Sequence, residues 1–367
     1  MRPSAVAPAE RITSLDVVRG VALYGVMAMN LVVDGFRVSI FERFLPETTP
    51  KPWLDRAVEN FLLAAFDLKA FALFSFLFGI GLAIQFDRLQ PARRTLLLVR
   101  RLAVLLTIGI IHLVFIWNGD ILTEYAVAGF VALPFLFGSR LLLAMGSICL
   151  LAFYAAFPAT MPIPDAMWLR EHVSAATSIY PTGDYAAILK LRIEELPGIL
   201  PLHVDIFPRT LGLFLLGAFI WRTGLVSRAS DYRDILAVIA LLGVSATVGV
   251  LRSNALADVT LALSYAAIIF AIMTTQAGSK VLGWAAPLGR MAFTNYLLQS
   301  LIFGFVFYGY GLGLFGKLGV TATLCFGTAV YVGQVMLSRW WLRDHTFGPV
   351  EWLWRRLMYG SPQETAA

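Results

Sequence analysis

Long stretches of the chain carry almost no charged side chains, and this feature limits the possible fold more than any other. One such stretch reads FALFSFLFGIGLAIQ. Hydrophobic residues make up 59% of the chain and charged residues 14%, against about 45–50% and about 25% in soluble domains. A single soluble core in 367 residues cannot hide this excess. The chain is therefore predicted to be an all-α polytopic membrane protein.

Ten segments are apolar over roughly the 20 residues that a helix needs to cross a hydrocarbon core of about 30 Å. Their apolar runs are unbroken, whereas the strands of outer-membrane barrels alternate at every second residue. We therefore expect about ten transmembrane helices, with no visible internal repeat. The segments are 15–33, 68–87, 96–117, 120–138, 140–158, 207–225, 233–251, 256–276, 287–309 and 318–337.

The basic residues indicate how these helices are oriented. Loops retained in the cytoplasm carry an excess of Lys and Arg, so the net charge of +6 suits a membrane protein and indicates lipids, not nucleic acid, as partners. When successive loops are assigned alternately to the two sides of the membrane, the basic residues collect on one side if both termini are cytoplasmic. On the opposite side, the positive and negative charges of the loop 34–60 nearly cancel. The cytoplasmic set is Arg2, Arg11, Arg88, Arg93, Arg94, Arg100, Arg101, Arg140, Arg222, Arg228, Arg233, Lys280, Arg290, Arg339, Arg343, Arg355 and Arg356.

The predicted spans divide the chain into five parts. An N-terminal cytoplasmic tail (1–14) precedes a first five-helix membrane half (15–158). A periplasmic segment (159–206) follows, in which apolar spacing predicts a short interfacial helix around 184–196. A second five-helix half (207–337) leads to a cytoplasmic interfacial helix and tail (338–367), with 361–367 expected to be disordered.

Polar residues inside spans are costly and often mark a functional site. We expect Asn30, Lys69, His112, Asp120 and Glu124, which come from four consecutive helices, to lie at one depth in the outer half of the bilayer. A histidine oriented by a carboxylate can act as a general base near neutral pH. The catalytic candidates are therefore His112 with Asp120 or Glu124, and the others line a polar cavity. Packing, helix capping and snorkelling are the structural alternatives.

A second group lies at the cytoplasmic ends of the first and third spans. Asp16, Arg19, Arg100 and Arg101 form a basic mouth, and arginine matches phosphate oxygens bidentately. We predict a site for a phosphorylated ligand there, with retention of positive charge in the cytoplasm as the alternative.

Two further sets of side chains lie within apolar runs. Asn295 and Gln299 are one turn apart in the ninth span, and either hydrogen-bond between helices or line the cavity. Cys149 and Cys325 show neither a CxxC spacing nor nearby histidines. We therefore predict neither a disulfide nor a metal site.

Several motifs carry a family resemblance over nearly the whole chain. ERITSLDVVRGVALYGVMAMN, FALFSFLFGIGLAIQ, RRLAVLLTIGIIHLVFIWNGDILTEYAVAG, LGRMAFTNYLLQS and FGPVEWLWRRLMYG resemble the YeiB-like family of bacterial inner-membrane proteins, which has a C-terminal domain of unknown function. That family is similar to a superfamily of transmembrane acyltransferases, which includes heparan-alpha-glucosaminide N-acetyltransferase and enzymes that modify surface polysaccharides.

The resemblance implies location in the bacterial inner membrane and transfer of an acyl group from cytoplasmic acyl-CoA or acetyl-CoA to an acceptor on the other side. The polysaccharide enzymes end their first span in a catalytic histidine where this chain has Asn30, and the loop 34–60 has no histidine. The base role would therefore fall to His112. His172, His203 and His345 lie outside the predicted spans.

Three functions remain open from the sequence. The first is an acyltransferase with a saccharide, lipid or small-molecule acceptor. The second is a secondary transporter, although the broken-helix repeats common in transporters are not visible. The third is a non-catalytic assembly component, and homo-oligomerisation is also open.

Overall fold

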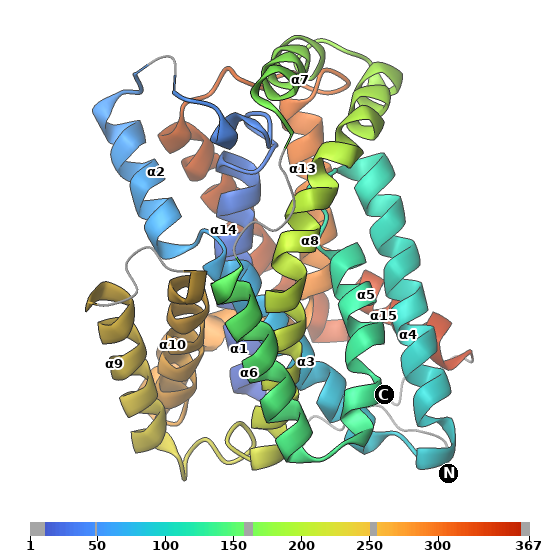
Figure 1. The fold of residues 1–367 in the computed structure, drawn as a ribbon, viewed down its shortest axis with the longest axis vertical. Helices are drawn as coiled ribbons and strands as arrows, with labels where there is room; N and C mark the ends of the chain where they lie inside the picture. The colour runs from blue at the N-terminus through green and yellow to red at the C-terminus, as the bar shows by residue number, and fades with distance from the viewer. Residues whose placement is uncertain (1–11, 48–49, 158–163, 250–254, 361–367) are drawn as a thin grey trace.

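A computed structural model describes residues 12–47, 50–157, 164–249 and 255–360, and throughout these ranges the ordered elements are helices, with no strand (Figure 1). The expected tail 361–367 and most of the tail 1–14 lie outside the described residues. The longer helices are α1 (Thr13–Val32), α2 (Trp53–Ala65), α3 (Lys69–Arg88), α4 (Pro91–Ile111), α5 (Leu122–Ala132), α6 (Arg140–Ala156), α7 (Ala166–Ile179), α8 (Tyr185–Thr223), α9 (Arg233–Gly249), α10 (Ala255–Met273), α13 (Ala292–Phe307), α14 (Val320–Asp344) and α15 (Pro349–Tyr359). The shorter elements are η2 (Glu42–Phe44), η3 (His112–Ile116), η4 (Pro134–Phe137), α11 (Gln276–Leu282), η5 (Gly283–Ala285) and α12 (Ala286–Arg290).

Among the described residues, six helical stretches are long and apolar enough to cross a bilayer, as expected of a helical membrane protein. Three further apolar helices, Leu122–Phe137, Arg140–Ala156 and Ala292–Phe307, are shorter. The six stretches are Thr13–Val32, Trp53–Arg88, Pro91–Ile116, Tyr185–Thr223, Leu256–Met273 and Val320–Asp344.

The largest departure from the predicted order is α8. The helix expected around 184–196 and the span expected over 207–225 are parts of one helix of 39 residues, about 58 Å long at about 1.5 Å per residue. Pro197, Pro201 and Pro208 lie inside it. The expected interfacial helix is therefore not a separate element. Its Ile188 and Leu191 side chains are buried against the protein, so its apolar spacing reflects internal packing.

Two smaller departures concern the loops. The region before the second predicted span contains α2, which lies at the upper left in Figure 1, beside α14. The last predicted span continues as α14 to Asp344, and the expected C-terminal interfacial helix is confined to α15. Helix α2 and the C-terminal end of α14 thus lie outside the apolar segments that define the predicted spans.

Helix α1 lies at the centre of the bundle, in contact with α3, α10, α12, α13 and α14. Close approach of α12 to α1 depends on glycine: a Cβ atom on Gly289 would lie 1.8 Å from the carbonyl oxygen of Asp16. Small residues at such crossings allow helix backbones to touch. This crossing places Asp16 and Arg19 beside the start of α13, where the candidate site lies.

Candidate functional site

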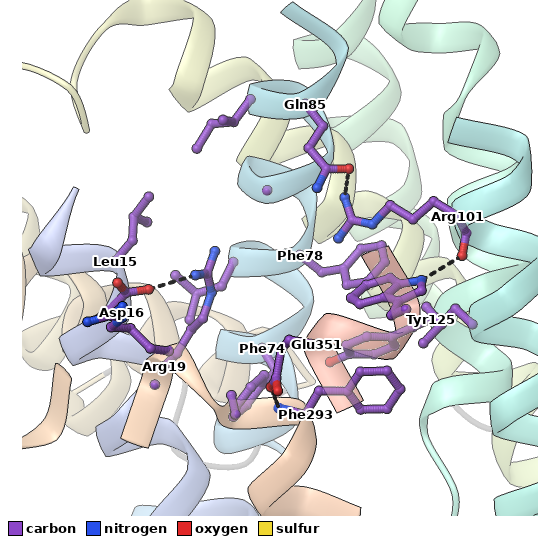
Figure 2. Close-up of a pocket in the computed structure, with 18 of the residues that line it drawn as sticks. Leu15, Asp16, Arg19, Phe74, Phe78, Gln85, Arg101, Tyr125, Phe293 and Glu351 are labelled. Carbon is purple, nitrogen blue, oxygen red and sulfur yellow. Dashed lines mark hydrogen bonds and ion pairs between the residues drawn. The ribbon is translucent and has the colours of Figure 1, made fainter. Parts of the chain in front are cut away.

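A cavity of about 650 Å³ opens between α1, α3, α4, α5, α13 and α15. It is polar at one end, where Asp16, Arg19, Gln85 and Arg101 line it (Figure 2). Aromatic side chains line the rest, among them Phe74, Phe78, Tyr125, Phe293 and Tyr296. The cavity is therefore amphipathic, and its volume lies within the range of about 300–1,000 Å³ common for ligand pockets.

The polar end contains two arginines that the sequence singles out. Arg19 Nη1 lies 3.1 Å from Asp16 Oδ1, one turn away on α1. Arg101 is 8% exposed and donates a hydrogen bond to the side chain of Gln85. Its guanidinium lies 4.5 Å from the ring centre of Trp354, a cation–π contact.

Arg100 does not belong to this site. Its side chain is exposed and does not line the cavity, although it is adjacent to Arg101 in the chain. Successive residues of a helix point about 100° apart (3.6 residues per turn), so one of the pair faces inward and the other outward. Of the four residues predicted to form the basic mouth, Asp16, Arg19 and Arg101 therefore line the cavity and Arg100 does not.

Helix α15 forms one wall of the cavity and is fixed by Glu351. The Glu351 carboxylate accepts hydrogen bonds from the backbone N–H of Phe293 at 2.9 Å and of Thr294 at 3.0 Å, at the first turn of α13. Carboxylates are favoured at helix N-termini. Burial raises the pKa of Glu351, and the hydrogen bonds from Thr294 oppose that shift. The indole N–H of Trp354 donates to the carbonyl of Arg101 at 3.0 Å, so α15 is tied to both α13 and α4.

Tyr125 and Tyr296 line the apolar part of the cavity. The Tyr125 hydroxyl donates to the carbonyl of Phe71 at 2.8 Å. The Tyr296 hydroxyl is buried and faces the backbone of Ile121 at the start of α5. Its ring centre lies 5.2 Å from that of His112. Tyr296 therefore lies between the cavity and the histidine, which is 0% exposed and does not line the cavity itself.

His112 is the first residue of η3, a π-helical turn that ends α4; such turns are frequent at functional sites. Its Nδ1 lies 2.8 Å from Asp120 Oδ1, so the predicted contact between these residues is present. Its Nε2 lies 2.9 Å from the hydroxyl of Ser300 on α13. Asp120 and Ser300 are 1% and 2% exposed. Asp120, His112 and Ser300 thus form a buried chain of hydrogen-bonded side chains.

Glu124, the other carboxylate considered for His112, pairs elsewhere. One of its oxygens lies 2.9 Å from His203 Nδ1, and the other accepts a hydrogen bond from Thr210. Both partners belong to α8. His203 was placed in an outer loop by the sequence, and the unbroken α8 brings it into the bundle instead. Glu124 therefore does not orient His112.

The remaining members of the expected outer cluster do not join His112. Lys69 Nζ lies 2.8 Å from Asp258 Oδ1 on α10 and donates to the carbonyl of Leu63 at 3.1 Å. Asn30 is 5% exposed, and its side-chain oxygen has no partner among the described residues. Neither residue lines the cavity. Residues predicted at one depth thus face in different directions.

Asn295 and Gln299 connect α13 to α14. The Asn295 amide donates to the hydroxyl of Ser338 at 2.9 Å, and the Gln299 amide donates to Gln334 at 2.8 Å. Neither lines the cavity, so both act as interhelical hydrogen-bonding residues. Of the two roles left open by the sequence, the interhelical hydrogen bond is therefore the one present in the structure.

Sequence reasoning did not select Tyr296, Ser300, Glu351 or Trp354. Tyr296 and Ser300 stand within the quoted motif TNYLLQS, one turn apart, yet serine and tyrosine are common in membrane helices. The Trp and Arg pattern of α15 indicated a membrane surface, and gave no sign that this helix lines a cavity.

Comparisons with known proteins cover nearly the whole chain. The C-terminal part, residues 220–361, matches the family described as a protein of unknown function (DUF418). The chain is 32% identical to the uncharacterized protein YxaH of Bacillus subtilis, over 97% of this chain and 96% of that protein. It is 28% identical to the uncharacterized protein YeiB of Escherichia coli, over 95% and 96%. The chain therefore belongs to the YeiB-like family.

Proposed function

We propose that this protein is a membrane-embedded acyltransferase that takes an acyl group from a CoA thioester bound in the cavity and delivers it to an acceptor from the opposite side. One observation carries the proposal: Arg19, Arg101 and Tyr296 line one amphipathic cavity, and the Tyr296 ring packs on the Asp120-bound His112. The arginines suit the phosphates of an acyl-CoA, and the aromatic lining suits its acyl chain. The buried histidine would act on the reacting groups.

The basic end suits the donor's phosphates. Arginine binds phosphate oxygens with two parallel hydrogen bonds, and Arg19 and Arg101 line the same end of the cavity. The acyl chain would lie among Phe74, Phe78 and Tyr125, where burial of each CH₂ group stabilises binding by about 0.8 kcal/mol. The nucleotide part of the donor would remain at the entrance.

The imidazole of His112 would serve as the base. Asp120 accepts a hydrogen bond from Nδ1–H, which leaves the Nε2 lone pair to accept a proton from an attacking hydroxyl or amine. The new bond forms between that attacking atom and the acyl carbonyl carbon, and the carbon–sulfur bond breaks. The imidazolium then returns the proton to the departing thiolate. The acceptor would be a saccharide, lipid or small molecule with a free hydroxyl or amine.

We further propose ten spans, with both termini cytoplasmic, in the inner membrane of a bacterium. Six of these spans are the long apolar stretches described above. The other four would be α5 with η4, α6, α9 and α13. The basic residues at the cytoplasmic ends of the predicted spans support this orientation. In it, the cavity entrance faces the cytoplasm, where acyl-CoA is made.

Binding of acyl-CoA to the purified protein tests the proposal. We expect Arg101→Gln to weaken the affinity for octanoyl-CoA by roughly 10–100-fold, because it removes a charge-assisted contact to phosphate. Arg100→Gln is the matched control, since this neighbouring side chain is exposed and lies outside the cavity, and it should leave the affinity unchanged. Equal effects, or no binding by the wild type, would contradict the proposal. Solute uptake by proteoliposomes without acyl transfer would favour a transporter.

A further inference from the structure

The hydroxyl of Ser300 completes an arrangement of three side chains from distant parts of the sequence. Its Oγ lies 2.9 Å from His112 Nε2, and His112 Nδ1 lies 2.8 Å from Asp120 Oδ1. Of the buried serines that the structure describes, Ser300 is the one hydrogen-bonded to an imidazole. An acid, an imidazole and a hydroxyl in this order are the parts of a serine nucleophile activated by histidine.

The hydrogen bonds fix the direction of proton movement. The Asp120 carboxylate only accepts, so Nδ1 carries the proton and Nε2 accepts from the Ser300 hydroxyl. When the imidazole is protonated, Nε2–H donates to Ser300 Oγ instead. The Ser300 hydroxyl can then donate to the carbonyl of Tyr296, 3.3 Å away. Each protonation state of His112 therefore has a complete set of partners, as a residue that gains and loses a proton during turnover requires.

We infer that Ser300 is the acyl carrier of this enzyme: it receives the acyl group from the thioester as an oxygen ester and passes it to the acceptor. The inference rests on the proposed acyltransferase function and replaces direct attack of the acceptor on the thioester by two steps through a covalent intermediate on Ser300. It also divides the reaction into two half-reactions, so the donor and the acceptor need not be bound at the same time.

Both half-reactions use the same three side chains. In the first, Ser300 Oγ bonds to the acyl carbon, its proton moves to His112 Nε2, the carbon–sulfur bond breaks, and the thiolate takes that proton to leave as free CoA. In the second, the acceptor's hydroxyl or amine gives its proton to His112 and attacks the ester carbon. The bond to Ser300 Oγ then breaks, and Ser300 regains its proton from His112.

The position of Ser300 fits the end of the cavity. Tyr296 lines the cavity and precedes Ser300 by four residues on α13, a rise of about 6 Å. Movement of Tyr296 would let the thioester carbonyl reach Ser300 while the basic end still holds the phosphates.

Acid quenching after brief exposure to octanoyl-CoA radiolabelled in its acyl group tests the inference. We expect label on the Ser300 peptide in the wild type, stable to neutral hydroxylamine and released at alkaline pH, as an oxygen ester is. Ser300→Ala should lose the label yet still bind octanoyl-CoA, and Ser300→Cys should give an adduct that neutral hydroxylamine cleaves. Ser147→Ala is the matched control, since Ser147 is also buried in a helix but has no hydrogen-bond partner among the described residues.

An alkyl fluorophosphonate provides a second readout that needs no CoA. We expect it to modify Ser300 in the wild type and at least 100-fold more slowly in His112→Gln, because the unactivated hydroxyl is a poor nucleophile. Acyl transfer that persists in Ser300→Ala, with no ester on the wild type, would overturn the covalent step alone. Failure of the wild type to bind any acyl-CoA would overturn the covalent step and the proposed function together.

Discussion

Asp120 Oδ1 lies 2.8 Å from His112 Nδ1, and both side chains are almost completely buried. The second oxygen of Asp120 accepts the backbone N–H of Thr123 at 2.7 Å, which fixes the carboxylate at the start of α5. The imidazole is thereby held in one tautomer and one orientation. This relationship decides which nitrogen faces Ser300, and the proposed chemistry depends on it.

Replacing Asp120 by asparagine tests that dependence. An amide side chain can donate to Nδ1, which reverses the tautomer and leaves Nε2 protonated and unable to accept a proton. We expect Asp120→Asn to lower the rate of acyl transfer by roughly 10²–10⁴-fold with little change in acyl-CoA affinity. A rate within about threefold of wild type would show that the tautomer is irrelevant.

Loss of Glu351 should loosen α15 and the cavity wall together. Glu351→Ala leaves the backbone N–H groups of Phe293 and Thr294 without their acceptor, at a cost of about 1–3 kcal/mol in the free energy of unfolding. Glu351→Gln keeps one side-chain acceptor oxygen and should cost less. Thermal unfolding in detergent ranks the stability of the wild type, Glu351→Gln and Glu351→Ala. Their affinity for acyl-CoA should fall in that same order. Equal melting temperatures for the three proteins would contradict this role.

The loop after α1 predicts a pH dependence of stability. Burial raises the pKa of Asp34 to about 7 from 3.8, against the opposing effect of Arg43, which lies 2.8 Å away. The folded state therefore binds this proton more tightly than the unfolded state does, and the associated stability is lost as pH rises from about 4 through about 7. We expect the melting temperature to fall across this window, and to fall less in Asp34→Asn. Equal slopes would show that Asp34 does not contribute.

The proposed topology gives a direct test in cells. Alkaline phosphatase is active in the periplasm, so a fusion after Tyr359 should be inactive and a fusion in the turn 117–119 should be active. Reporters at these two positions lie at opposite ends of the proposed spans. A C-terminal fusion active only in the periplasm would invert the orientation and place the cavity entrance on the wrong side for acyl-CoA.

The parts of the site that could be predicted are those close together in the sequence. Asp16 lies one turn from Arg19, and Asp120 lies just beyond the tight turn after His112, so local geometry almost determines both pairs. Ser300 comes from 188 positions further along the chain than His112. No spacing rule joins such positions, because the contact depends on how α13 packs against the end of α4.

The sequence predicts a depth in the membrane for each polar residue, but not the direction in which its side chain points. Lys69 was expected near His112 by depth alone, and it faces α10 and Asp258 instead. Arg100 and Arg101 could not be told apart, because a mostly apolar helix has no clear inward face. Three prolines lie inside α8, but neighbouring helices can stabilise a proline-containing membrane helix. Helix α8 is continuous and brings His203 inward.

Acyl transfer by His112→Gln tests the central claim most directly. Glutamine keeps hydrogen-bonding capacity at this buried position but cannot act as a base. His172→Gln is the matched control, because His172 lies on α7, where its ring stacks on Trp168. We predict that His112→Gln binds octanoyl-CoA normally and transfers the acyl group at least 100-fold more slowly, while His172→Gln retains wild-type rates. Wild-type transfer by a folded His112→Gln protein would contradict the account.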